Sequence, residues 1–177
     1  MQSRLRIITH QTDSSPIHFG FAQSPCGQCL FAWQQDVLLL LAFCPAVYRD
    51  DALADLLRLW PAACESRDDA VAARWAERIF HSNAPLTVLL KGTEFQQQVW
   101  QALLQIPAGA TCSYADIAKA VGRPRAYRAV GSAVGANPVA WLIPCHRVLP
   151  AGGGLGNYRW GKETKQLLLE AETPEPT

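Results

Sequence analysis

The sequence predicts an α/β N-terminal subdomain, with a small antiparallel sheet and helices, followed by an α-helical C-terminal subdomain with a winged-helix-like helix-turn-helix. Two observations lead to this fold class. Short apolar runs bounded by turn residues dominate the first half, whereas apolar residues at helical spacing dominate the second. The chain has 177 residues and is 49% hydrophobic, which is enough to build a core in each part. We place the two subdomains at residues 1–90 and 91–177.

Three strand-like runs form the predicted sheet, at residues 17–24, 28–34 and 36–43. The turn between the first two contains a CxxC formed by Cys26 and Cys29. We assign it to a hairpin turn and not to a zinc site, because no second ligand pair stands at a matching spacing. Two amphipathic helices follow. Their ranges and apolar faces are 50–60 with Leu53, Leu56, Leu57 and Trp60, and 68–80 with Val71, Trp75 and Ile79.

The second subdomain is predicted to contain three consecutive helices and one more at its end, after a link at residues 81–92. Capping boxes begin the first two helices at Thr93 and Ser113, because a Gln or Asp three residues later can bond back to each. Gly122 ends the second helix and Pro124 begins the third. The apolar faces are Phe95, Val99, Leu103 and Ile106, then Tyr114, Ile117, Ala118 and Val121, then Ala126, Ala129, Val130, Ala133 and Val134, and the last helix covers 162–172.

The charge distribution favours a local contact with phosphates. The net charge is only +1, but the stretch from Lys119 to Arg128 has four cations and no acid. This stretch covers the turn between the second and third helices, so the pair matches a DNA-binding helix-turn-helix, with an ordinary helical hairpin as the alternative. Apart from Arg128, the outward face of the third helix is mostly small, which favours docking with little sequence preference.

The N-terminus and the cysteines indicate the compartment. The first residues contain no apolar signal segment, and no apolar stretch is long enough to span a membrane. The six cysteines stand in a chain with an ample core, so we expect no disulfide framework. We therefore expect a cytoplasmic protein without a membrane partner.

The segment IPCHRV, residues 143–148, places a cysteine next to a histidine. The nucleophilic form of cysteine is the thiolate, and a thiol with an ordinary pKa of about 8.5 needs a base to supply it at neutral pH. Adjacent residues of an extended chain point to opposite faces, so a direct contact between Cys145 and His146 is not assured. A buried structural thiol is the alternative.

At these residues the chain resembles the O6-alkylguanine-DNA alkyltransferases. The similarity runs from GTEFQQQVWQALLQIPAGATCSYADIAKAVGRPRAYRAVGSAVGANP through PCHRV to GNYRWG, and PCHRV behind a helix-turn-helix is highly specific. The segments GTEFQQQVWQAL and YRWG look most like the C-terminal domain of the bacterial Ada protein. The resemblance implies DNA repair by direct reversal, in which O6-alkylguanine is flipped out of duplex DNA and its alkyl group passes irreversibly to a cysteine, once per molecule. It leaves open the alkyl sizes accepted and whether O4-alkylthymine is repaired.

The resemblance also implies the roles of the catalytic residues. Cys145 matches the alkyl acceptor, His146 the residue that activates it through a bound water, and Glu172 the carboxylate that orients this histidine. A water relay removes the need for a direct contact between thiol and imidazole, and the series extends the logic of a catalytic triad. Asn137 matches the asparagine that packs the active-site turn. Glu172 as a solvated helix-end acid and Asn137 as a simple turn residue are the alternatives.

The DNA-contacting positions carry over in the same way. Tyr114, which could instead be a core residue, and Arg128 match the residues that handle the flipped nucleotide. On chemical grounds the Tyr114 phenol can donate to the leaving guanine, and a side chain such as Arg128 must fill the gap that the flipped nucleotide leaves. The phosphate-contacting turn corresponds to Ala115 and Arg123, and the rim of the lesion pocket to Val148, Ala151, Asn157, Tyr158 and Arg159, with Ala151 also contacting DNA. The implied partner is double-stranded DNA, bound through the minor groove by a monomer in the bacterial cytoplasm or nucleoid, without a metal or other cofactor. Residues 91–177 are then the DNA-binding and alkyl-acceptor subdomain and residues 1–90 the scaffold.

Some positions depart from the family pattern. Arg159 stands where many animal members have serine, and Tyr127 is bulkier than the usual small residue beside the arginine. Rival functions are a non-catalytic lesion sensor, a helix-turn-helix regulator and a cysteine hydrolase. The acceptor Cys145 argues against the sensor, the small-residue helix face against the regulator, and the lack of an oxyanion-hole motif against the hydrolase.

Overall fold

The computed structural model describes residues 4–11 and 14–173. The chain divides into two compact units, Met1–Lys91 and Gly92–Thr177. Each unit has its own buried apolar core. Among the described residues, no helix combines the length and apolarity needed to cross a membrane.

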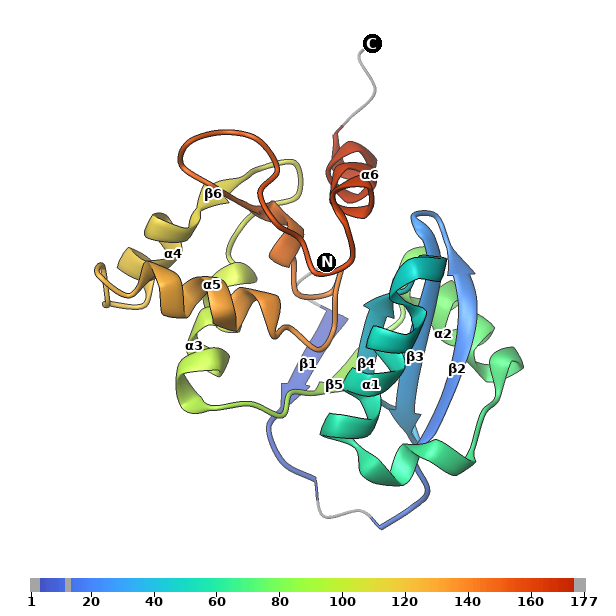
Figure 1. The fold of residues 1–177 in the computed structure, drawn as a ribbon. Helices are drawn as coiled ribbons and strands as arrows, with labels where there is room; N and C mark the ends of the chain where they lie inside the picture. Colours follow the sequence, from blue (N-terminus) through green and yellow to red (C-terminus); the bar gives the residue numbers. More distant parts are fainter. Residues whose placement is uncertain (1–3, 12–13, 174–177) are drawn as a thin grey trace. The chain divides into compact units, whose positions relative to one another are not determined.

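A five-stranded mixed sheet forms the centre of the N-terminal unit (Figure 1). Its strands are β1 (Leu5–Ile8), β2 (His18–Ser24), β3 (Gly27–Gln34), β4 (Val37–Phe43) and β5 (Leu86–Leu89), in the spatial order β1-β5-β4-β3-β2. The predicted antiparallel sheet is confirmed for β2, β3 and β4. It is wrong for β1 and β5, which pair in parallel with each other, while β5 also pairs in parallel with β4. β5 lies inside the predicted link at 81–92, and a four-residue strand is too short for an alternating pattern to stand out.

The β2–β3–β4 meander supplies much of this unit's core. Leu30 and Phe31 of β3 and Leu38 of β4 are completely buried, because the pleat places them under neighbouring strands and helices. Cys26 lies in the turn between β2 and β3, and Cys29 follows in β3; both are buried and neither is in a disulfide. The assignment of the CxxC to a hairpin is thus confirmed.

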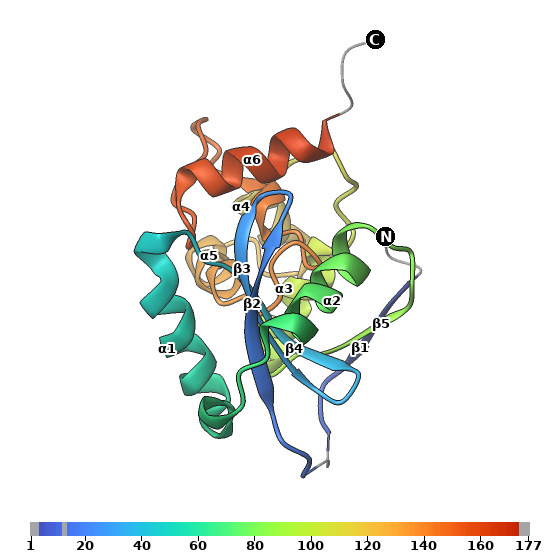
Figure 2. The same ribbon diagram turned by 90° about the vertical axis from the view of Figure 1, so that its right-hand side faces the viewer.

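Two helices, α1 (Arg49–Leu59) and α2 (Asp69–Phe80), lie on opposite sides of these strands (Figure 2). The predicted face of α2 is confirmed at Trp75 and Ile79, which are buried. In α1 the buried face is narrower than predicted, because Leu57 is 41% exposed and only Leu56 of the expected leucines is fully buried. Two short 3-10 turns flank α1, η2 (Ala46–Tyr48) and η3 (Pro61–Glu65).

The C-terminal unit is mainly helical. Its elements are α3 (Glu94–Leu103), β6 (Cys112–Ser113), α4 (Tyr114–Ala120), α5 (Tyr127–Gly135), η4 (Cys145–Arg147), β7 (Val148–Leu149) and α6 (Lys162–Glu172). Both predicted capping boxes are present, at Thr93 and Ser113. Gly122 ends the second helix region with a φ of 72°. The third helix begins later than predicted from Pro124, because Arg123 and Ala126 close a turn by a backbone hydrogen bond of 2.9 Å.

Helices α3 and α5 form the core of this unit. Trp100 is buried, and its indole Nε1 donates to the Ala133 carbonyl at 2.9 Å. On α5 the buried positions are Val130, Ala133 and Val134, whereas Ala129, predicted to be buried, is exposed. The exposed face of α5 is therefore wider than predicted and includes Ala129 in the first turn.

Gly20 marks a close approach in the N-terminal unit. Phe19 donates from its backbone N to Ser66 O at 2.9 Å, and Asp68 N donates to Phe19 O at 2.8 Å. A Cβ on Gly20 would lie 2.4 Å from the Asp68 carbonyl oxygen. We expect Gly20→Ala to lower the free energy of unfolding in urea by roughly 1–3 kcal/mol.

The matched control is Gly152→Ala, where no heavy atom lies within 4 Å of the added Cβ. This variant should keep the stability of the parent protein. Equal unfolding midpoints for the two variants would show that the approach of Asp68 to β2 is not tight.

Candidate active site

Cys145 begins the 3-10 turn η4, directly after Pro144. Its backbone N donates to Ile143 O at 2.8 Å, and Arg147 N donates to Pro144 O at 3.1 Å. The segment is therefore a tight turn and not an extended strand. Both Cys145 and His146 are buried by this turn and its surroundings.

Asn137 holds the active-site turn in place by hydrogen bonds to the backbone. Its Nδ2 donates to Ile143 O at 2.8 Å, and its Oδ1 accepts from Val139 N at 3.1 Å. The side chain is buried, so these bonds satisfy polar groups that water cannot reach. Asn137 also lowers the pKa of the Cys145 thiol, in opposition to burial, and so favours the thiolate.

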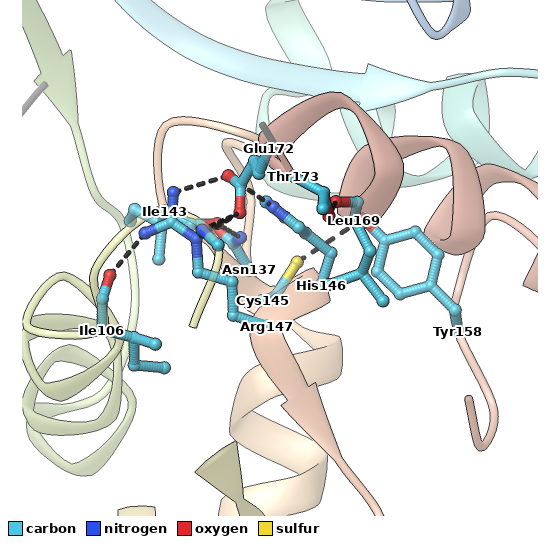
Figure 3. Close-up of polar contacts among 11 residues, drawn as sticks. Ile106, Asn137, Ile143, Cys145, His146, Arg147, Tyr158, Leu169, Glu172 and Thr173 are labelled. Carbon is cyan, nitrogen blue, oxygen red and sulfur yellow. Dashed lines mark hydrogen bonds and ion pairs between the residues drawn. The ribbon is translucent and has the colours of Figure 1, made fainter. Parts of the chain in front are cut away.

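His146 is held by Glu172, the last residue of α6. The distance between His146 Nε2 and Glu172 Oε1 is 2.9 Å (Figure 3). Burial raises the pKa of Glu172, but hydrogen bonds from His146 and Arg147 outweigh it and lower that pKa to about 2. An ionised carboxylate only accepts hydrogen bonds, so Nε2 carries the imidazole proton.

The other imidazole nitrogen is therefore a free acceptor. His146 Nδ1 is buried and has no hydrogen-bond partner among the described residues. Burial lowers the pKa of His146, although the Glu172 carboxylate raises it in part. The imidazole is thus a neutral base at neutral pH, with its lone pair on the side away from Glu172.

Arg147 anchors the same carboxylate and was missed in the sequence. Its Nε donates to Glu172 Oε2 at 2.8 Å and its Nη2 to Oε1 at 2.5 Å, a bidentate pair. Its Nη1 donates to the Ile106 carbonyl, and Gly109 N donates to Glu172 Oε2 at 3.4 Å. A cation directly after His146 in an apolar run was the available signal, because a buried guanidinium needs an acidic partner.

Trp141 fixes the plane of the imidazole. Its ring stacks on His146, with centroids 5.7 Å apart and planes 9° apart. Trp141 has a φ of 68°, a conformation that costs free energy for a bulky residue and is often found at functional sites. Nothing in the sequence indicates that this tryptophan has a positive φ.

Cys145 lies at a pocket whose lining includes five of the predicted site residues: Tyr114, Asn137, Asn157, Tyr158 and Arg159. The distance from Cys145 Sγ to Tyr158 Oη is 3.7 Å, within hydrogen-bonding range for sulfur. The two other predicted rim residues are not among those that line the pocket. Val148 is completely buried in β7, and Ala151 is exposed in the glycine-rich loop.

Lys165, on the buried face of α6, is a second residue that the sequence did not single out. Only 1% of Lys165 is exposed, and its Nζ donates to Val148 O at 2.7 Å and Leu155 O at 2.8 Å. Burial raises the pKa of Cys145, whereas hydrogen bonds from Asn137 and Tyr158 and the Lys165 charge lower it. The thiol is therefore protonated at rest, in surroundings that stabilise the thiolate once the proton leaves.

Comparison with known proteins decides the family. A family model described as the DNA binding domain of 6-O-methylguanine DNA methyltransferase matches residues 94–174. The chain is 40% identical over 159 residues to the methylated-DNA–protein-cysteine methyltransferase of Mycobacterium tuberculosis, covering 88% of this chain and 92% of that protein. The chain belongs to the O6-methylguanine-DNA methyltransferase family.

Further matches agree with this family and confirm the resemblance seen in the sequence. The bifunctional Ada protein of Escherichia coli is 38% identical over 177 aligned residues, which cover 94% of this chain and 49% of Ada. With 46% of the Salmonella typhimurium Ada protein covered as well, the chain spans about half the length of these two relatives. The crystal structure of M. tuberculosis OGT in complex with DNA has a TM-score of 0.69 and 36% identity, and the match covers 88% of this chain and 92% of that one.

In this methyltransferase-family fold, the predicted DNA-contacting residues gather around α4 and α5. Ala115 lies in the first turn of α4, and Arg128 is exposed in the first turn of α5. Arg123, in the turn between them, places its guanidinium 5.3 Å from the centroid of the Phe95 ring. The structure thus brings Ala115, Arg123 and Arg128 to one helix–turn–helix segment, while Ala151 belongs to the loop between β7 and α6.

Glu172 makes stability depend on pH. Its pKa of about 2 lies below the ordinary 4.5, so its contribution is complete above pH 4.5 and is lost as the pH falls toward 2. His146, whose pKa is lowered from 6.5 by burial, adds to this loss because below pH 6.5 the unfolded chain binds a proton at this histidine while the buried ring stays neutral. We expect Glu172→Gln to reduce the unfolding free energy at neutral pH by about 3–5 kcal/mol, because Arg147 is left buried without its partner.

Chemical denaturation across the acid range is the measurement. Glu172→Gln should also show a shallower loss of stability between pH 4.5 and 2 than the parent protein. The control is Glu170→Gln, an exposed glutamate on the same helix. Parallel pH profiles for the parent protein and Glu172→Gln would rule out this linkage.

Proposed function

We propose that this chain repairs O6-alkylguanine in duplex DNA by transferring the alkyl group irreversibly to Cys145, once per molecule. The observation that carries the proposal is the Cys145 thiol at the pocket, in the same turn as a neutral His146 held by Glu172. The names of the relatives support it, since they are methylated-DNA–protein-cysteine methyltransferases and an OGT crystallised with DNA.

The proton of the thiol leaves through His146 in this mechanism. A water molecule between Cys145 Sγ and His146 Nδ1 accepts the thiol proton and passes one to the imidazole lone pair. Glu172 stabilises the imidazolium that forms, as the carboxylate does in a catalytic triad. The buried Nδ1 atom without a protein partner supports this path.

Alkyl transfer then forms the sulfur–carbon bond and breaks the carbon–O6 bond. The electron pair of the broken bond stays on guanine, which takes a proton from the Tyr114 phenol. Burial, together with the nearby Cys145, raises the pKa of Tyr114, so the phenol stays protonated until negative charge develops on the leaving guanine. The imidazolium restores the Tyr114 proton through solvent. Among the described residues that line the pocket, Cys145 is the one thiol, so the alkyl group stays on its sulfur.

DNA recognition is assigned to α4, α5 and the turn between them. We infer that this helix-turn-helix approaches the minor groove, that Ala115 and Arg123 contact phosphates, and that Arg128 enters the space left by the flipped nucleotide. Ala151 is a further DNA contact in this proposal. A small-residue face with one long cation supports docking with little sequence preference. The winged-helix description stays a prediction, since β6 and β7 form only a two-residue parallel pair.

The division of labour between the two parts of the chain is likewise a proposal. Every residue assigned to chemistry or DNA contact lies after residue 91, so residues 91–177 act as the DNA-binding and alkyl-acceptor subdomain and residues 1–90 as a scaffold. A monomer located in the cytoplasm and working without a cofactor remains our prediction.

A titration with excess lesion DNA tests the proposal. We expect the amount of repaired guanine to level off at one per protein molecule, with the alkyl group on Cys145 when the protein is digested and weighed. Cys145→Ser should bind lesion DNA and transfer nothing. Cys112→Ser, which changes another free thiol of the same unit, should react like the parent protein.

Two results would contradict the proposal. Product that keeps accumulating beyond the protein concentration would reveal turnover by a step not considered. Transfer by Cys145→Ser would assign the acceptor to another residue.

A further inference from the structure

Tyr127 is an aromatic side chain left in solvent beside the proposed DNA-binding groups. It is the first residue of α5 and is 51% exposed. Among the described residues, the other large hydrophobic side chains with high exposure are Val47, Leu57 and Leu167. An exposed aromatic ring gains free energy when a partner covers it, and Tyr is enriched at binding surfaces for this reason.

The position of Tyr127 on α5 connects it to the pocket. Residues four apart on a helix share one ridge, so Tyr127 is followed along its ridge by Gly131 and Gly135. Both glycines line the pocket that contains Cys145. The Tyr114 ring packs next to this ridge, since a Cβ on Gly131 would lie 3.8 Å from the ring. Tyr127 therefore stands one helical turn, roughly 6 Å along the axis, from the wall of the pocket.

The charges around Tyr127 identify the partner as a nucleic acid. Arg123, Arg125 and Arg128 are all exposed, and the first turn of α5 has no acidic residue. Cations interleaved with an aromatic ring are typical of surfaces that bind phosphates and stack bases. The two glycines after Tyr127 carry no side chain that would keep a DNA strand away from the helix.

We propose that Tyr127 contacts the lesion strand directly: its ring stacks on the base next to the flipped nucleotide, while Arg128 fills the space that this nucleotide leaves. Arg128 is one residue further along α5, about 100° around the helix, so the two side chains can contact different parts of the DNA around the flipped nucleotide. Stacking is indifferent to base identity, which agrees with a helix face that offers no base-reading side chains. This inference rests on the proposed function, because it requires a nucleotide extruded into the pocket.

Single-turnover transfer on two substrates tests the inference. We expect Tyr127→Ala to slow transfer from duplex DNA containing O6-methylguanine by roughly ten-fold, the loss of one base–aromatic stack, and to leave reaction with the free base O6-benzylguanine unchanged. Tyr127→Phe should restore the duplex rate because it keeps the ring. Leu167→Ala, which removes an equally exposed side chain on α6, is the matched control and should change neither rate.

A fluorescence measurement locates the contact. In the Cys145→Ser background, 2-aminopurine beside the lesion in the same strand should be brighter with Tyr127→Ala than with Tyr127 or Tyr127→Phe. The same probe several base pairs away should not distinguish the variants.

Three outcomes separate the possibilities. An unchanged duplex rate for Tyr127→Ala, or equal slowing on both substrates, would overturn the stacking role while leaving alkyl transfer intact. If the parent protein transfers from neither substrate, the proposed function itself fails, and the inference fails with it.

Discussion

The buried carboxylate of Glu172 is the interaction on which the geometry of the site depends. It accepts hydrogen bonds from His146 and Arg147 of the active-site turn and from Gly109 of the loop after α3. Two segments distant in sequence from each other, the active-site turn and the loop after α3, are thus tied to the end of α6 by one charge. A buried anion and a buried guanidinium are each costly alone, so each stabilises the arrangement only while the other is present.

The chemistry of the site follows from this anchoring. Because the Glu172 carboxylate accepts a hydrogen bond from His146 Nε2–H, the lone pair of the imidazole is left on Nδ1, and the Trp141 ring holds the imidazole in that orientation. Burial keeps the Cys145 thiol neutral, while Lys165, which also bonds the Val148 and Leu155 carbonyls, supplies a fixed positive charge. The thiolate is therefore favoured only when a base removes the proton, which limits reaction with anything but a bound substrate.

Local patterns in the sequence predicted the helices well and the sheet only in part. The capping boxes at Thr93 and Ser113 involve residues three positions apart, so the sequence shows them directly. The pairing of β1 with β5 joins residues near positions 5 and 86, and no local pattern encodes it. Long-range contacts also explain which site residues were missed. Glu172 was indicated only by a family resemblance, and the sequence did not single out Arg147, Lys165 or Trp141 because their contacts exist only in the folded chain.

The protonation state of His146 tests this account most directly. Nitrogen NMR of protein labelled at histidine, with the signal assigned by its loss in His146→Gln, reports which ring nitrogen carries the proton. The account predicts a neutral ring at neutral pH, with the proton on Nε2 and a bare Nδ1, and a loss of this preference when Glu172 is replaced by Gln. A charged ring at neutral pH, or a proton on Nδ1, would contradict it, because Nδ1 could then accept nothing from the thiol.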